Sequence, residues 1–154
     1  MTETVPAVSM ATANMGVLIP LSVHFDDLDP MGMLHNTRYQ ALVERAWVAF
    51  WRKHGLISEK GPEGDSFNVV KAFTITYNRP IVMFGEYAVH LWIERMGATS
   101  ATAGYRVCSA DGETTYAYGS RTAVRLDPTT LSPTPWSEKV RKTARLLQGP
   151  QDSR

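Results

Sequence analysis

Residues 37–54 read TRYQALVERAWVAFWRKH and carry the pattern of one long helix. Thr37 and Gln40 match a capping box at its start, and Gly55 follows a basic last turn, so both ends of the helix are marked. Apolar side chains recur at spacings of three and four and form one broad face, made of Tyr39, Leu42, Val43, Ala46, Trp47, Ala49, Phe50 and Trp51. A face this wide and this aromatic predicts a helix enclosed by a sheet.

Five further segments have the composition of β-strands, because they are rich in Val, Ile, Thr, Tyr and Ala and partly alternate. They are residues 17–25, 67–77, 87–95, 99–109 and 114–126. Pro20 predicts that the first strand lies at an edge, and Asp111–Gly112 predicts a hairpin with a type I′ turn. We therefore expect an α+β fold, in which an antiparallel sheet of about five strands wraps around one long central helix. The strands from residue 67 onward should follow one another as a meander.

The length of 154 residues is most simply one domain with a core of its own. Residues 1–16 lack the basic leader and the apolar run of a secretory signal, so we expect a flexible tail. The folded domain should span residues 17–127. Residues 128–154 predict a proline-rich linker and a short basic helix over 137–148.

Composition excludes several classes of function. The net charge of +1 with scattered Lys and Arg offers no basic stripe, so nucleic acid is not an expected partner. No stretch approaches the roughly 20 apolar residues that cross a bilayer, and we expect a soluble protein. Cys108 is the only cysteine, which excludes an intrachain disulfide and fits a reducing, cytoplasmic setting.

The residues HFDDLDPMG at 24–32 place a carboxylate in a tight turn before the helix. Pro30 biases Asp29 toward an extended backbone, and Gly32 permits a sharp reversal. Asn36 or Thr37 can cap the helix that follows, whose first backbone N–H groups are unpaired donors. A carboxylate beside such donors is a recognisable catalytic arrangement.

The chain resembles the 4-hydroxybenzoyl-CoA thioesterase family of the hot-dog fold over residues 18–127. The order of one strand, one long helix and further antiparallel strands is that of the hot-dog fold. The family's motif is matched by FDDLDPMG and the helix after it, with Phe25, Asp29, Gly32, Asn36, Tyr39 and Glu44 in register. A second, weaker likeness is IERMGATSATAGY at 93–105, which looks like the family's strand, glycine turn and strand.

The resemblance implies hydrolysis of acyl-CoA or acyl-carrier-protein thioesters without a metal or cofactor, in sites formed between two subunits of a dimer. It gives Asp29 the role of nucleophile or general base, and gives the backbone N–H of Asn36 the role of polarising the thioester carbonyl. Gly32 would provide room in the turn. Met31, Met33 and Leu34 depart from the aromatic or histidine residues frequent there, which bears on the acyl group that is preferred.

Further residues are candidates for the site. Glu44 is the second choice for the catalytic carboxylate, since another branch of hot-dog thioesterases uses one on the helix. The expected substrate contacts are Gly32, Met33, His35, Tyr39, Arg95 and Arg121, of which the two arginines would bind the phosphates of coenzyme A. A capping role for His35 and solvation of the arginines are the alternatives. The histidines have no spacing that suggests a metal site.

Two other functions remain open at this stage. A noncatalytic acyl-CoA-binding protein would keep the groove without turnover, and an enoyl-CoA hydratase or dehydratase could use Asp29 with His35. In each case, open strand edges predict pairing of two copies into a homodimer, or of four into a homotetramer. The sequence does not choose the acyl group, the carrier or the mode of attack.

Overall fold

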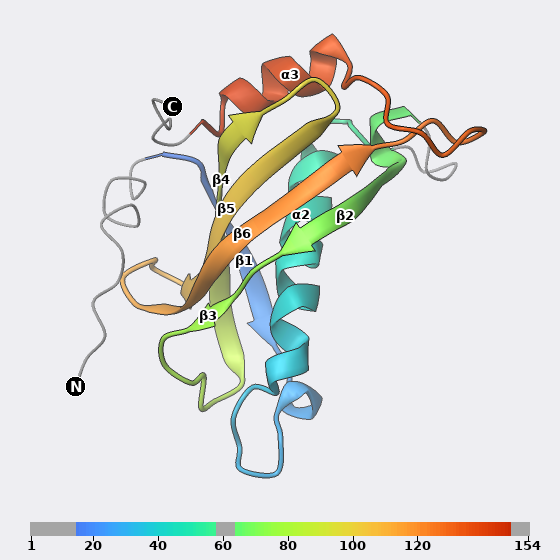
Figure 1. The fold of residues 1–154 in the computed structure, drawn as a ribbon. Helices are drawn as coiled ribbons and strands as arrows, with labels where there is room; N and C mark the ends of the chain where they lie inside the picture. Colours follow the sequence, from blue (N-terminus) through green and yellow to red (C-terminus); the bar gives the residue numbers. More distant parts are fainter. Residues whose placement is uncertain (1–14, 58–63, 149–154) are drawn as a thin grey trace.

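The computed structural model describes residues 15–57 and 64–148 and has the predicted α+β class, an antiparallel sheet against one long helix (Figure 1). Its elements in chain order are β1 (Val17–Val23), the 3-10 turns η2 (Phe25–Asp27) and η3 (Asn36–Arg38), α2 (Tyr39–Lys53), η4 (Gly64–Ser66), β2 (Asn68–Phe73), β3 (Thr76–Tyr77), β4 (Gly85–Met96), β5 (Ser100–Ser109), β6 (Thr115–Arg125) and α3 (Glu138–Arg145). Each described strand lies in or within two residues of a predicted segment.

The sheet has the order β1-β4-β5-β6-β2, with the short β3 also paired to β6, and all its pairs are antiparallel. The expectation of a meander from residue 67 onward is correct for β4, β5 and β6. It is wrong for β2, which crosses to the far edge and pairs with β6 instead of β4. Pro20 lies on edge strand β1 as predicted, opposite Ala88 of β4.

Helix α2 packs across one face of the sheet and fills the core (Figure 1). Alternation along β4 explains this arrangement, because Val89, Leu91 and Ile93 are in the core with the helix while His90 and Trp92 point to the opposite face. The helix residues buried against the sheet are Tyr39, Leu42, Val43, Ala46, Trp47 and Phe50. Six of the eight residues of the predicted apolar face are therefore in the core, whereas Trp51 is partly buried and Ala49 is exposed.

The sequence prediction for the C-terminal end of the helix is correct, and the prediction for its N-terminal end is wrong. At the C-terminal end, Gly55 has a φ of 69° and its N–H donates to the carbonyl of Arg52 at 3.1 Å, as predicted. At the N-terminal end, the predicted cap by Asn36 or Thr37 is wrong. The side chain of His35 caps η3 instead, through Nδ1, which accepts the N–H of Thr37 at 3.2 Å. No side chain caps α2 at Arg38.

The Asp111–Gly112 hairpin is present, but its turn is not type I′. That turn needs positive φ at both central residues, and of the two only Gly112 has it, with φ 79°. The loop runs from the Ser109 end of β5 to Thr115 of β6. Ser109 closes it, because its backbone N–H donates to the carbonyl of Thr114 at 2.9 Å and its hydroxyl donates to Asp111.

Helix α3 lies within the predicted range 137–148 and packs at the end of the sheet, beside the C-terminal end of α2 (Figure 1). Val140, Ala144 and Leu147 are buried, and the backbone N–H of Ile93 in β4 donates to the carbonyl of Leu147. The segment after residue 127 therefore contributes to the core. Within the described residues, no helix combines the length and apolar composition needed to cross a membrane.

Candidate active site

The Asp29 carboxylate lies inside the turn that precedes the helix. Its Oδ1 accepts the N–H groups of Met31 at 2.9 Å and Met33 at 3.1 Å. The backbone N–H of Gly32 donates to the carbonyl of Asp29, and Gly32 has a φ of 81°, as its predicted role in a sharp reversal requires. Oδ2 of Asp29 has no partner among the described residues. One oxygen is thus fixed by the turn and the other is left for a ligand or water.

Asn36 begins the helical segment, one residue after the cap. Its own backbone N–H has no acceptor within residues 15–57 and 64–148. Because the neighbouring N–H of Thr37 is capped by His35, the N–H of Asn36 is the donor that remains available at this end.

The chain around Asn36 is held from two sides. Buried Leu34 donates its N–H to the carbonyl of Ile81 at 2.8 Å, which fixes the chain two residues before Asn36. The hydroxyl of Tyr77 donates to the carbonyl of Asn36 at 3.2 Å, which ties the start of the helix to β3. A donor that must stay oriented while charge develops on a substrate needs such a rigid frame, because reorientation during the reaction would reduce its benefit.

A short antiparallel bridge between Leu28 and Leu34 separates Asp29 from Asn36. Asp29 lies on the turn side of this bridge, and the N–H of His35 on its other side donates to the carbonyl of Asp27. No hydrogen bond between described atoms joins Asp29 to Asn36. The two groups therefore flank the same small bridge without a hydrogen bond between them in the described chain.

The structure brings Glu44 and Arg121 together, although they are 77 positions apart. Arg121 donates from Nε to Oε1 at 2.6 Å and from Nη2 to Oε2 at 2.9 Å, and its guanidinium lies 5.9 Å from the ring centroid of Trp47. Such a bidentate pair is strong and directional. Glu44 is accordingly engaged by an arginine, and Arg121 faces the helix.

The other predicted substrate contacts are dispersed. Tyr39 is buried in the core with its ring 5.1 Å from that of Tyr77, and burial raises the pKa of its hydroxyl. Arg95 is exposed beside a bulge in β4, whereas Met96 after it packs against the core. Alternation therefore directs Arg95 away from Arg121. Substrate contacts by Tyr39, His35, Met33 and the arginines stay predictions.

Exposed apolar residues lie at the turn, and they meet others on a loop that the sequence analysis did not single out. Phe25 and Met31 are largely exposed, and the ring of Phe25 meets that of Phe84 edge to face at 6.0 Å. Val82 and Met83, next to Phe84, are exposed as well. The signal that could have found this loop is its run of four apolar residues from 81 to 84, which no strand pattern explains.

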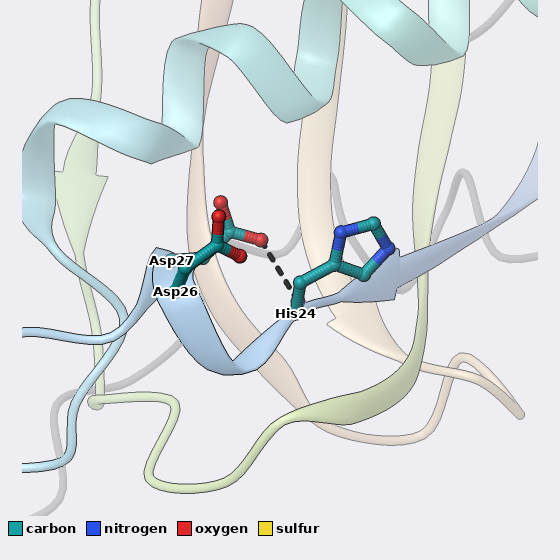
Figure 2. A group of neighbouring side chains, drawn as sticks. All are labelled: His24, Asp26 and Asp27. Carbon is teal, nitrogen blue, oxygen red and sulfur yellow. Dashed lines mark hydrogen bonds between the residues drawn. The ribbon is translucent and has the colours of Figure 1, made fainter.

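The structure also groups His24, Asp26 and Asp27 at the junction of β1 and η2, where their potential ligand atoms lie within 4.8 Å of one another (Figure 2). Asp27 is buried, and its Oδ2 accepts the backbone N–H of His24 at 2.8 Å. Its Oδ1 lies 3.9 Å from Nε of Arg38. Asp27 thus caps the short turn η2, while His24 and Asp26 are exposed.

A second polar cluster lies on the face of the sheet opposite α2. Nδ1 of buried His90 accepts from Nε of Arg106 at 3.0 Å, and Nε2 of His90 lies 2.6 Å from the carbonyl of Met15. Nη1 of Arg106 also donates to the carbonyl of Gly112 and to the hydroxyl of Thr115. Since Nδ1 accepts, the proton of the neutral ring is on Nε2. Burial, with a smaller contribution from Arg106, lowers the pKa of His90.

The chain belongs to the thioesterase-like superfamily, whose sequence profile matches residues 23–143. The predicted membership of a hot-dog thioesterase family is thereby confirmed. No curated protein sequence matches the chain.

Solved structures of this class are similar to the chain. A candidate acyl-CoA thioesterase from Xanthomonas campestris is 30% identical with a TM-score of 0.66, covering 80% of this chain and 99% of that chain. The PA2801 protein of Pseudomonas aeruginosa, a candidate thioesterase, is 27% identical with a TM-score of 0.75, covering 83% and 97%. A thioesterase from Thermus thermophilus, complexed with coenzyme A and Zn, is 24% identical with a TM-score of 0.72, covering 88% and 97%.

The His90 cluster predicts that the protein loses stability in mild acid. A buried histidine with a lowered pKa is neutral in the folded state, so below about pH 6.5 the unfolded chain binds more protons and the free energy of unfolding falls with pH. We expect the midpoint of urea unfolding to fall between about pH 7 and about pH 5. His90→Gln should make this dependence shallower, and an equal slope in wild type and variant would contradict the assignment.

Proposed function

We propose that the protein hydrolyses an acyl thioester of coenzyme A or of an acyl carrier protein, releasing a free acid and a thiol. The observation that carries the proposal is the Asp29 carboxylate, with one oxygen held by two amides of its own turn and the other without a partner in the described chain. Membership of the thioesterase-like superfamily and the coenzyme A complex of a Thermus thermophilus relative support the substrate class.

In the proposed reaction the thioester carbonyl oxygen accepts the N–H of Asn36, which stabilises the negative charge that develops there. Asp29 acts in one of two ways. As a general base, its free oxygen takes a proton from water while the water oxygen attacks the carbonyl carbon. As a nucleophile, it forms an anhydride that water then hydrolyses. In both routes the C–S bond breaks and the thiolate leaves and is protonated.

A noncatalytic acyl-CoA-binding protein is the second candidate, and one observation favours it. Two hydrogen bonds to Oδ1 would be reason enough for an aspartate at position 29, because they close the turn without any catalytic role. A hydratase or dehydratase would need the imidazole of His35 to face the substrate, but its Nδ1 is already hydrogen bonded to Thr37. Hydrolysis is the function we retain.

We further propose a homodimer in which two β2 edges meet and bring together parts of the two sites. Among the described strands, β2 pairs with β6 alone, and Val69 and Val70 on it are exposed, an arrangement that favours pairing with a second strand. We also propose a cytoplasmic setting, which the free and buried thiol of Cys108 supports.

Replacing Asp29 tests the catalytic assignment. Asp29→Asn keeps an Oδ1 that can accept the two amides, so the fold should be retained while kcat falls by about 10²–10⁴. Asp29→Ala removes the turn bonds as well and should also lower the free energy of unfolding by about 1 kcal/mol. Thiol release from acyl-CoA and thermal unfolding measure the two effects. Thiol release by Asp29→Asn at the wild-type rate would contradict the catalytic role of Asp29, whereas acyl-CoA binding without thiol release by the wild type would favour the binding protein.

Glu44 can be separated from Asp29 by the same assay. Because Glu44 is paired with Arg121, Glu44→Gln should lower kcat by less than about tenfold and weaken the fold by about 1 kcal/mol or less, the range of partly exposed ion pairs. Arg121→Gln is the matched variant for the other half of the pair. A folded Glu44→Gln protein without thiol release would transfer the catalytic role to Glu44.

The dimer has a direct measurement. Light scattering at micromolar concentration should give about twice the 17.1 kDa chain mass, or four times if dimers pair again. Val69→Lys with Val70→Lys places charges on the β2 edge and should shift the protein toward monomer. Leu18→Lys with Ser22→Lys on the β1 edge is the control. A wild-type monomer would exclude a site shared between subunits.

A further inference from the structure

A cavity of about 230 Å³ opens between α2, the β2–β6 edge of the sheet and the segment that leads into α3. Glu44, Trp47 and Trp51 contribute its helix side, and Asn68 and Arg121 its sheet side. Trp136 and Val140 close it from the C-terminal segment. If each atom takes roughly the 30 Å³ of a water molecule in the liquid, the cavity holds about eight carbon or oxygen atoms.

The cavity walls combine aromatic surface with one ion pair. Trp47 and Trp136 are 3% and 7% exposed, and their indole Nε1 atoms are shielded from solvent, so these residues offer a ligand the apolar surface of their rings. Glu44, the carboxylate of α2, is already bound by Arg121. An apolar ligand would fit this lining.

The cavity is displaced from Asn36 along the helix. Glu44 is eight residues beyond Asn36 and Trp51 a further seven, which places them about 12 Å and 22 Å along the axis at a rise of about 1.5 Å per residue. Trp136 packs beside Trp51 and is therefore at the far end. A chain anchored by its thioester at Asn36 would pass Glu44 before it meets the tryptophans.

We infer that this cavity receives the distal part of a long acyl chain, and that Trp136 limits the length of chain that fits. The inference rests on the proposed hydrolysis and specifies its substrate class: acyl groups long enough to span about 12 Å along α2. The stacked rings of Trp47 and Trp51, 5.7 Å apart, contact the apolar chain, and the ring of Trp136 lies at its end.

Binding to the Asp29→Asn protein tests the cavity independently of turnover. Calorimetric titrations with coenzyme A and with butanoyl-, octanoyl-, dodecanoyl- and hexadecanoyl-CoA should show affinity rising with chain length, by about tenfold or more overall. The inference would be overturned if all the acyl-CoA compounds bound with equal affinity, or if coenzyme A without an acyl group bound as tightly as they do.

Two substitutions locate the effect. Val140→Phe narrows the cavity and should shift the preference to shorter chains, while Trp136→Phe puts a smaller ring at its end and should shift the preference to longer chains. Trp92→Phe is the matched control, because this buried tryptophan lies on the opposite face of the sheet, against Gly104. Unchanged profiles in both cavity variants would refute the assignment.

Two further outcomes separate this inference from a binding site for a free small molecule and from the proposed hydrolysis. If methyl dodecanoate bound without competing with dodecanoyl-CoA, the cavity would be a site for a free small molecule. The placement of the substrate chain in it would then be overturned. Chain-length selectivity of binding without any thiol release by the wild type would contradict the proposed hydrolysis alone and support the acyl cavity.

Discussion

Burial of one aromatic helix face against one sheet is the constraint on which the rest of the structure depends. Tyr39, Trp47 and Phe50 are each 3% exposed, and burying such side chains contributes about 1.5–3 kcal/mol apiece. The direction of α2 across the sheet is thereby set. Its N-terminal end comes to the Asp29 turn, and its C-terminal end comes to α3 (Figure 1).

Periodic features were predictable from the sequence, and long-range pairings were not. The helix and the strands follow from spacings within a few residues, whereas the place of β2 beside β6 depends on which edge of the sheet is left open. The Glu44–Arg121 pair joins residues on different elements, and no local pattern indicates it. For His35 the sequence leaves capping and acid–base roles side by side, because an imidazole cap is less common than a hydroxyl or carboxylate cap.

The carboxylates near the helix differ in how many of their oxygens are already engaged by hydrogen bonds or ion pairs within the fold. Both oxygens of Glu44 are bound by Arg121, and those of Asp27 lie near the His24 N–H and the Arg38 guanidinium. Asp29 alone of these three keeps one oxygen unbound within the described chain. The sequence motif selects Asp29 by resemblance, and its hydrogen bonds leave one oxygen available for the role that we propose.

The segment after residue 127 has a larger role than a linker would have, and a single carboxylate explains how it is held. Asp65 accepts the backbone N–H of Ser137 at 2.9 Å and its hydroxyl at 2.6 Å, and lies 3.3 Å from the guanidinium of Arg125. These bonds fix the residue next to Trp136, and the same Ser137 caps the start of α3. One wall of the cavity therefore depends on an acidic residue about seventy positions away in the sequence. Because Asp65 lines the cavity and also holds Ser137, replacing it would change the lining directly and would alter the position of Trp136 as well.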